Sequence, residues 1–220
     1  MKKRVLITGA TGMIGSLVLQ HCLDSKEVDA VISLLRRPSG IQHQKLEEII
    51  VDDFLHLDEN AAYFDGIDIV YYCLGIYTGT VNRETFRQIT VDYPEILARI
   101  LAGKSHNLTF CLLSGAGADR AERSRMMFAK DKGIIENRLS NMGLKTFHAF
   151  RPGYIYPVKP RKEPNFSYRL FRWLYPVLKL FGKNASIQST ELAQAMFNVG
   201  LIGCDLEILE NRDILQQVSS

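Results

Sequence analysis

Three glycines stand within seven residues near the start of the chain, in the stretch TGATGMIG that covers residues 8–15. The apolar run RVLI precedes them and the apolar run SLVLQHCL follows, which predicts a strand before the glycines and a helix after them. A glycine-rich turn in this context is typical of a dinucleotide site. We assign Gly9 to the tight turn, Gly12 to the approach of the pyrophosphate, and Gly15 to close packing of the helix on the sheet.

The residues between these glycines belong to the same predicted cofactor site, namely Thr11, Met13 and Ile14. The backbone N–H groups at the start of a helix lack partners within the helix and attract phosphate. The alternative is a flexible turn that binds nothing, since glycine spacing alone is a weak signal. The strand before the turn and the helix after it favour the nucleotide site.

Two arginines, Arg36 and Arg37, end the second predicted strand in the stretch SLLRRPSG. An acidic residue in this region would bind the ribose 2′-hydroxyl of NAD, whereas an arginine accommodates the 2′-phosphate of NADP. A guanidinium group forms paired hydrogen bonds with a phosphate. We therefore expect NADP(H) rather than NAD(H), with a solvated pair of surface charges as the alternative.

Strands and helices alternate along most of the chain, which predicts a doubly wound parallel α/β sheet. Strands are expected at 4–8, 29–35, 47–51, 67–74, 108–113 and 144–153. Helices are expected at 13–25, near 58–64, at 83–103 with Pro94 bending or splitting it, and at 119–143. Asp119 and Glu122 predict a capping box that opens the last of these helices, and Gly143 predicts its end. We expect one domain over residues 1–220, with a small helical cap or lid at 153–205.

Several further motifs give the chain a family resemblance. They are DFLHLD, CLG, VDYP, LLSGAGAD, KGIIE and FRPG, in addition to the glycine turn. Together they resemble the short-chain dehydrogenase/reductase superfamily, in its atypical or extended branch, and within it the oxidoreductases similar to the Tat-interacting protein. The resemblance implies a Rossmann fold, with Asp53 of the Asp53-Phe54 pair contacting adenine. It also implies that Leu74 and Gly75 lie beside the cofactor.

Enzymes of this superfamily use a serine, a tyrosine and a lysine, the last two in the spacing YxxxK. That spacing places both side chains on one face of a helix. By resemblance, Ser114 would hold the substrate oxygen and Lys132 the ribose of the cofactor. The residue four positions before Lys132 is Phe128, which has no proton to give.

Phe128 leaves three interpretations open. Another group could supply the proton, with Tyr77, Tyr154 and Tyr156 as candidates. The protein could bind NADPH without reacting, as a redox-inactive sensor or a partner-binding protein. The assumed helix register could be wrong, although the helix contains no other YxxxK. The leading prediction is an NADP(H)-dependent oxidoreductase acting on a carbonyl or alcohol.

The composition excludes several other classes of protein. The formal net charge of +3 is too small to indicate nucleic-acid binding. The four cysteines are widely separated and form no zinc motif, which predicts free thiols, no metal site and a reducing, cytoplasmic location. No run reaches the ~20 apolar residues of a membrane span.

One segment, residues 166–183, interleaves aromatic and basic side chains in the sequence FSYRLFRWLYPVLKLFGK. We expect it to form a substrate lid or the interface of a homodimer. Contact with a membrane surface is the second interpretation. Single-stranded nucleic acid would also fit this pattern, but we do not expect it as a partner.

Overall fold

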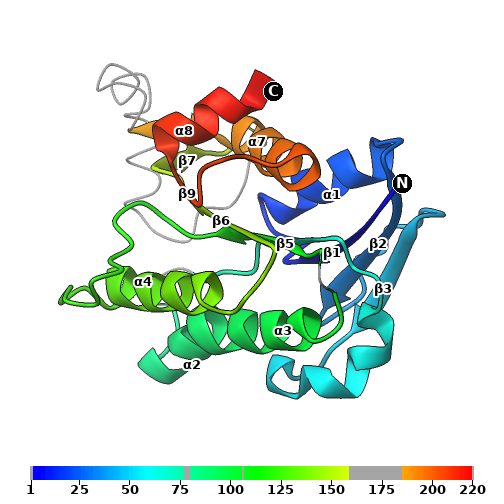
Figure 1. Ribbon diagram of the computed structural model, residues 1–220, viewed down its shortest axis with the longest axis horizontal. Helices are drawn as coiled ribbons and strands as arrows, with labels where there is room; N and C mark the ends of the chain where they lie inside the picture. Colours follow the sequence, from blue (N-terminus) through cyan, green and yellow to red (C-terminus); the bar gives the residue numbers. More distant parts are fainter. Residues whose placement is uncertain (1, 77–79, 106, 159–184, 220) are drawn as a thin grey trace.

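The computed structural model describes residues 2–76, 80–105, 107–158 and 185–219. Seven parallel strands form one sheet in the order β3-β2-β1-β4-β5-β6-β9 (Figure 1). Their bounds are β1 Lys3–Thr8, β2 Val28–Leu35, β3 Leu46–Ile50, β4 Ile69–Tyr72, β5 Thr109–Leu113, β6 Thr146–Arg151 and β9 Ile208–Glu210. The predicted doubly wound parallel sheet is confirmed.

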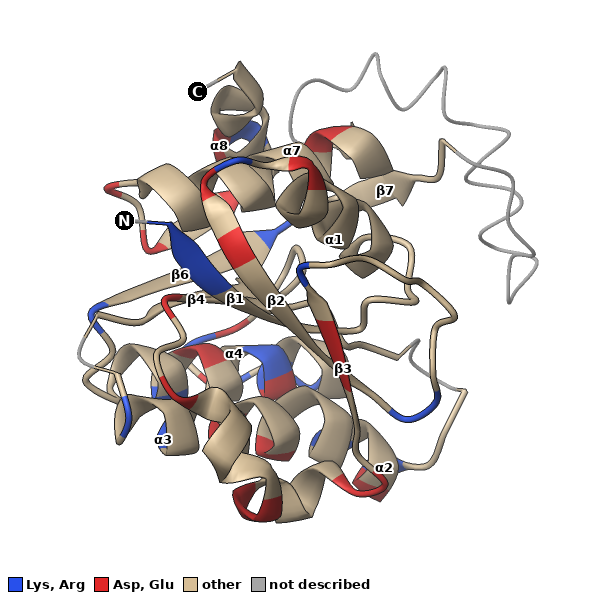
Figure 2. Ribbon diagram, turned by 90° about the vertical axis from the view of Figure 1, so that its right-hand side faces the viewer, with Lys and Arg blue, Asp and Glu red and all other residues tan. Residues whose placement is uncertain are grey.

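Helices cover both faces of this sheet, as the two views in Figures 1 and 2 show. One face packs against α1 Gly15–Asp24, α7 Ser189–Ile202 and α8 Asn211–Gln216. The other packs against η1 Phe54–Phe64, α3 Tyr93–Ala102 and α4 Met127–Ser140. The strands are apolar on both faces because each face is buried under a helical layer. Two separate hydrophobic cores result.

Strand β1 lies between β2 and β4, so the order of strands reverses at β1. The connections that leave β1 and β4 therefore run to opposite faces of the sheet. Ligands of open α/β sheets bind at such a point, beside the carboxyl ends of the strands. The glycine turn follows β1 directly and lies at this edge.

The predicted helix at 83–103 is interrupted, as expected from Pro94. It consists of α2 Arg83–Arg87, a π-helical turn η2 Gln88–Asp92, and α3. Pro94 occupies the first turn of α3, where its missing N–H costs little. The π turn therefore lies directly before the proline, and π turns in helices are frequent at functional sites.

The predicted helix at 119–143 is wrong at its start, because α4 begins at Met127. The Asp119 carboxylate does not open a helix. It accepts hydrogen bonds from the backbone N–H groups of Ala121, Arg123 and Ser124 within a loop. Glu122 has a φ of 60°, a left-handed conformation that excludes it from a capping box.

The predicted cap region is described at its two ends only. Strands β7 Tyr154–Tyr156 and β8 Ser186–Gln188 form a small separate sheet. Helix α7 follows them and packs on α1 and on β4, where the Tyr71 hydroxyl donates to the carbonyl of Phe197 at 2.9 Å. Residues 159–184, which include most of the aromatic and basic segment, lie outside the described residues. The lid, interface and membrane interpretations therefore stay predictions.

Among the described residues, no helix is both long enough and apolar enough to cross a membrane.

Gly133 fixes the loop 115–126 against α4. A Cβ atom at this position would lie 1.8 Å from the carbonyl oxygen of Asp119. We predict that Gly133→Ala lowers the free energy of unfolding by about 1–3 kcal/mol, because the backbone must shift to admit the methyl group. Urea denaturation would measure the change. Gly103→Ala is the matched control, since its Cβ would make an ordinary 3.5 Å contact. Equal stability of both variants would contradict this packing.

Candidate functional site

The glycine turn between β1 and α1 has no space for side chains at two positions. Gly9 has a φ of 71°, and a Cβ atom there would lie 2.6 Å from the carbonyl oxygen of Cys73. At Gly15 a Cβ atom would lie 2.2 Å from the carbonyl oxygen of Gly9. The backbone of the turn is therefore in direct contact with the end of β4 and the start of α1. This agrees with the predicted tight turn and close helix packing.

The start of α1 is suited to an anion. The N–H group of Gly12 donates to the carbonyl of Gly9 at 2.8 Å and closes the turn. Ile14 is the residue that precedes the helix, and Thr11 is exposed beside it. The first turn of the helix carries the positive end of the helix dipole, although the N–H of Ser16 already donates to the carbonyl of Gly12 at 3.1 Å. A pyrophosphate fits this backbone, and the glycines leave room for it.

The adenosine side of the predicted site lies beyond β2 and β3. Arg36 and Arg37 are exposed immediately after β2. Phe54 is buried and stacks on Tyr93 with ring centroids 5.4 Å apart. Asp53 accepts a hydrogen bond from the N–H of Leu55 at 2.9 Å.

Two charged residues of the predicted adenosine side act on the pKa of Tyr93. Burial raises the pKa of the Tyr93 phenol, and the charge of Asp53 raises it further. The charge of Arg36 lowers the pKa of the same phenol. The charges of Asp53 and Arg36 thus both act on the Tyr93 phenol, which the sequence alone did not show.

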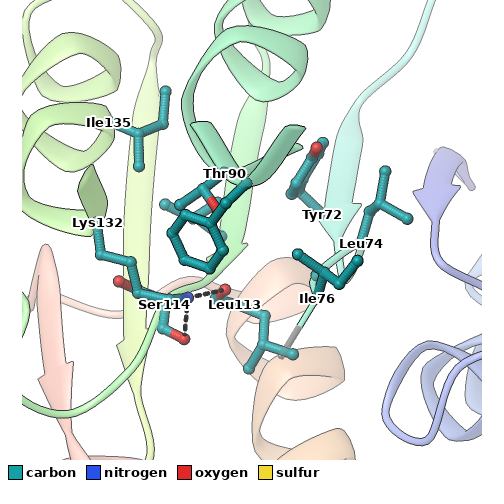
Figure 3. Close-up of a pocket in the computed structure, with 11 residues that line it drawn as sticks. Tyr72, Leu74, Ile76, Thr90, Leu113, Ser114, Lys132 and Ile135 are labelled. Atoms are coloured by element: carbon teal, nitrogen blue, oxygen red, sulfur yellow. Dashed lines mark hydrogen bonds between the residues drawn. The ribbon is translucent and has the colours of Figure 1, made fainter. Parts of the chain in front are cut away.

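A pocket lies at the ends of β4 and β5 (Figure 3). Its wall is mostly apolar and contains Tyr72, Leu74, Phe86, Leu112 and Ile135. The predicted residues Leu74, Gly75, Ser114 and Lys132 all line it. The structure thus brings together the residues that the sequence placed after β4, after β5 and on α4. Phe86 and Thr90, on α2 and the π turn, were missed, since no motif marked them.

Lys132 reaches the end of β5 from α4. Its ammonium group donates to the carbonyl of Leu113 at 3.3 Å and to that of Ser114 at 2.6 Å (dashed lines in Figure 3). Burial lowers the pKa of Lys132 to about 8, and the nearby carboxylate of Glu136 partly opposes this shift. The lysine therefore changes its charge within reach of neutral pH.

The Ser114 hydroxyl is directed to a carboxylate rather than to open space. It donates to Glu136, which is fully buried and also binds the guanidinium of Arg151. Nε of Arg151 lies 3.1 Å from Oε1 of Glu136. In this arrangement the hydroxyl hydrogen of Ser114 forms a hydrogen bond with Glu136. The predicted role of Ser114 at a substrate oxygen stays a prediction.

Phe128 and Lys132 face the end of β5 together. The ammonium of Lys132 lies 5.4 Å from the centre of the Phe128 ring. A Cβ atom built on Gly115 would lie 2.9 Å from Phe128 Cζ and 3.6 Å from the Lys132 methylene groups. The expected helix register therefore agrees with the structure here. Gly115 therefore lies against both side chains, and the sequence alone did not single it out.

The candidate tyrosines are placed differently. Tyr154 and Tyr156 lie on β7, and neither lines the pocket. Tyr77 lies outside the described residues. The described part of the chain thus offers no phenol that replaces Phe128 in a simple way.

A buried carboxylate links α4 to α2. Asp131 has no exposed surface and binds the guanidinium groups of Arg83 and Arg87. Both arginines flank Phe86, which lines the pocket. This ion pair, absent from the sequence predictions, holds one wall of the pocket in place.

The cysteines are free, as predicted. Cys22, Cys73 and Cys111 are buried and Cys204 is half-buried. Burial raises the pKa of the Cys73 thiol to about 12, which makes it unreactive near neutral pH. Within the described ranges, no three His, Cys, Asp or Glu side chains gather as metal ligands.

Comparison with known proteins shows the family to which this chain belongs. The sequence profile of a family described as NAD(P)H-binding matches residues 9–156, from the glycine turn to β7. The chain belongs to this family. The nicotinamide dinucleotide expected from the glycine turn is thereby supported, without a distinction between NAD and NADP.

Two relatives extend the comparison. The rat (Rattus norvegicus) Protein HTATIP2 is 27% identical over 97% of this chain and 88% of its own length. The mitochondrial Protein FMP52 of Eremothecium gossypii is 27% identical over 68% of this chain and 65% of its own length. The predicted resemblance to the Tat-interacting-protein-like branch of atypical short-chain dehydrogenases is confirmed.

Solved structures share the fold at low sequence identity. A short chain dehydrogenase family protein of Francisella tularensis superposes with a TM-score of 0.64 at 16% identity, covering 97% of this chain and 93% of that chain. The enzyme WbmH of Bordetella bronchiseptica, solved in complex with NAD+, has a TM-score of 0.69 at 17% identity, covering 94% of this chain and 74% of that chain. The Rossmann-type fold is therefore shared with these proteins.

Gly15 provides a direct test of the dinucleotide site. We predict that Gly15→Ala weakens the binding of NADPH about tenfold or more, because the methyl group displaces the carbonyl of Gly9 from the turn. Titration calorimetry measures the dissociation constant, and thermal unfolding shows whether the variant is folded. A folded variant with an unchanged dissociation constant would remove the turn from the binding site.

Proposed function

We propose that this protein is an NADP(H)-dependent oxidoreductase that acts on a carbonyl or an alcohol. The observation that carries the proposal is the position of two features on one edge of the sheet. The anion-binding turn follows β1, and the pocket that contains Lys132 lies at the ends of the neighbouring strands β4 and β5. A dinucleotide bound across the switch point would have its pyrophosphate at the turn and its reactive end near this pocket.

The preference for NADP(H) over NAD(H) rests on the arginine pair. Arg36 and Arg37 are exposed after β2, and Arg36 lies close enough to Tyr93 to affect its pKa. A 2′-phosphate at this place would meet one or two guanidinium groups and no carboxylate at the strand end. When bound, the cofactor supplies the hydride, and the chain supplies binding, orientation and charge.

The competing function is a redox-inactive NADPH-binding protein. Phe128 is the observation that favours it, because it stands four residues before Lys132, where the YxxxK pattern has a tyrosine, and carries no ionisable group. The retained lysine, with its pKa near 8, favours the enzyme. Oxidation of NADPH in the presence of a carbonyl compound would decide between the two.

The location and the partners of the protein are separate proposals. The four free cysteines suit a reducing compartment, and we propose the cytoplasm. The FMP52 relatives carry the word mitochondrial in their names, so fractionation should include that organelle. A homodimer through residues 166–183 is a further proposal that sedimentation would test.

The arginine pair gives a prediction about cofactor choice. We expect NADPH to bind more tightly than NADH, and Arg36→Ala/Arg37→Ala to weaken NADPH binding about 10- to 100-fold. Hydrogen bonds to a charged phosphate are worth about 1.5–3 kcal/mol, which corresponds to this range. Binding of NADH should change little. Calorimetric titration with NADPH, NADP+, NADH and NAD+ would measure each constant.

The matched control is Arg123→Ala/Arg125→Ala, which removes two exposed charges from the loop before α4. It should leave the ratio of NADPH to NADH affinity unchanged. If the Arg36/Arg37 variant keeps the same ratio as the wild type, the arginines do not select the cofactor. If no dinucleotide binds to the wild type, the oxidoreductase proposal fails.

A further inference from the structure

We propose that Lys132 is the source of the proton that the oxygen of a reduced substrate takes up, in place of the missing tyrosine phenol. The inference rests on the proposed oxidoreductase function and deepens it. It goes beyond the ribose-binding role that the family resemblance gives to this lysine.

The other polar groups of the pocket are unsuited to this role. The Tyr72 hydroxyl donates to the carbonyl of Ile89 at 3.1 Å, and burial raises the pKa of this phenol well above its usual range. The Ser114 hydroxyl donates to Glu136. Thr90 carries an aliphatic hydroxyl, which has no ionisation near neutral pH. Among the described residues that line the pocket, Lys132 is then the group able to give and regain a proton.

The hydrogen bonds of Lys132 orient its remaining proton. An ammonium group has three N–H donors. Two of them are directed to the carbonyls of Leu113 and Ser114, at the end of β5. These carbonyls fix the nitrogen at the pocket wall, and one N–H is left for a ligand. The Phe128 ring covers the ammonium group on another side, at 5.4 Å from the ring centre.

The surrounding charges permit the lysine to lose its proton. The facing carboxylate is Glu136, one turn along α4, and its charge is shared with Arg151 and Arg120. Asp131, the neighbour of Lys132 in sequence, is paired with arginines of α2. Neither carboxylate is therefore an exclusive partner of the lysine. Burial against apolar side chains dominates and lowers the pKa to about 8, near the optimum for proton transfer at neutral pH.

The step balances in atoms and electrons. The carbonyl carbon of the substrate accepts a hydride from a reduced nicotinamide dinucleotide, and the electron pair of the C=O π bond moves to the oxygen. An N–H bond of Lys132 breaks as an O–H bond forms, which leaves an alcohol, a neutral amine and the oxidised dinucleotide. The amine then takes a proton from water. The substrate class is that of the proposed function, an aldehyde or a ketone.

The first test needs no turnover. The chain without cofactor is acetylated with trace acetic anhydride between pH 6 and 11, and mass spectrometry follows each lysine. Only the neutral amine reacts, so the labelling of Lys132 should reach half its maximum near pH 8. The labelling of Lys130, which is exposed on the same helix, is the internal control. A Lys132 that fails to label, or that titrates with Lys130, overturns the proposal.

The second test separates proton donation from binding. Arginine keeps the charge but does not deprotonate, so Lys132→Arg should retain NADPH binding and lose turnover of 4-nitrobenzaldehyde by about 10²-fold or more. In the wild type, the rate should fall as pH rises through about 8, because the neutral amine has no proton to donate. Adding Phe128→Tyr to Lys132→Arg should recover part of the rate. Lys130→Arg is the matched control and should behave as the wild type.

The outcomes of these tests distinguish a failure of the proposed role of Lys132 from a failure of the proposed oxidoreductase function. If the wild type reduces 4-nitrobenzaldehyde and Lys132→Arg is equally active, the proton comes from elsewhere and only the role of Lys132 is overturned. If the wild type binds NADPH but oxidises it with no carbonyl compound, the oxidoreductase function fails, and the role of Lys132 fails with it.

Discussion

The end of strand β5 is held by two charged side chains that lie one turn apart on α4. Lys132 binds the last backbone carbonyls of the strand, and Glu136 accepts the hydroxyl proton of Ser114. Glu136 is fully buried and Lys132 is partly buried, and an unpaired charge in such a place would be costly. The paired arrangement fixes the distance between helix and strand. The shape of the pocket depends on that distance.

Helix α4 also holds the segments that surround the pocket. Asp131 holds α2 through two arginines, and Gly133 lets the loop 115–126 lie directly on the helix. Three consecutive residues of α4 thus contact three different segments of the chain. These contacts hold Lys132 in place, as a group that transfers protons must be held by its neighbours.

Much of the sheet and of its helical layers could be predicted from the sequence. Alternating apolar segments predicted the parallel sheet and the glycine turn after its first strand, because both depend on local pattern. The start of α4 could not be predicted, since Asp119 caps loop N–H groups that a linear reading assigns to a helix. The pairing of Ser114 with Glu136, and the place of Gly115 opposite Phe128, depend on contacts between β5 and α4. No spacing rule reveals such contacts.

The packing of α7 on α1 has a consequence for the order in which the chain can fold during synthesis. Val18 and Cys22 of α1 share one hydrophobic core with Leu192 and Met196 of α7. About 170 residues separate the two helices in the sequence. During synthesis, α1 leaves the ribosome long before α7, which packs on it, has been made. The apolar face of the N-terminal half is therefore exposed through most of translation, a period in which chaperones bind nascent chains and aggregation competes with folding.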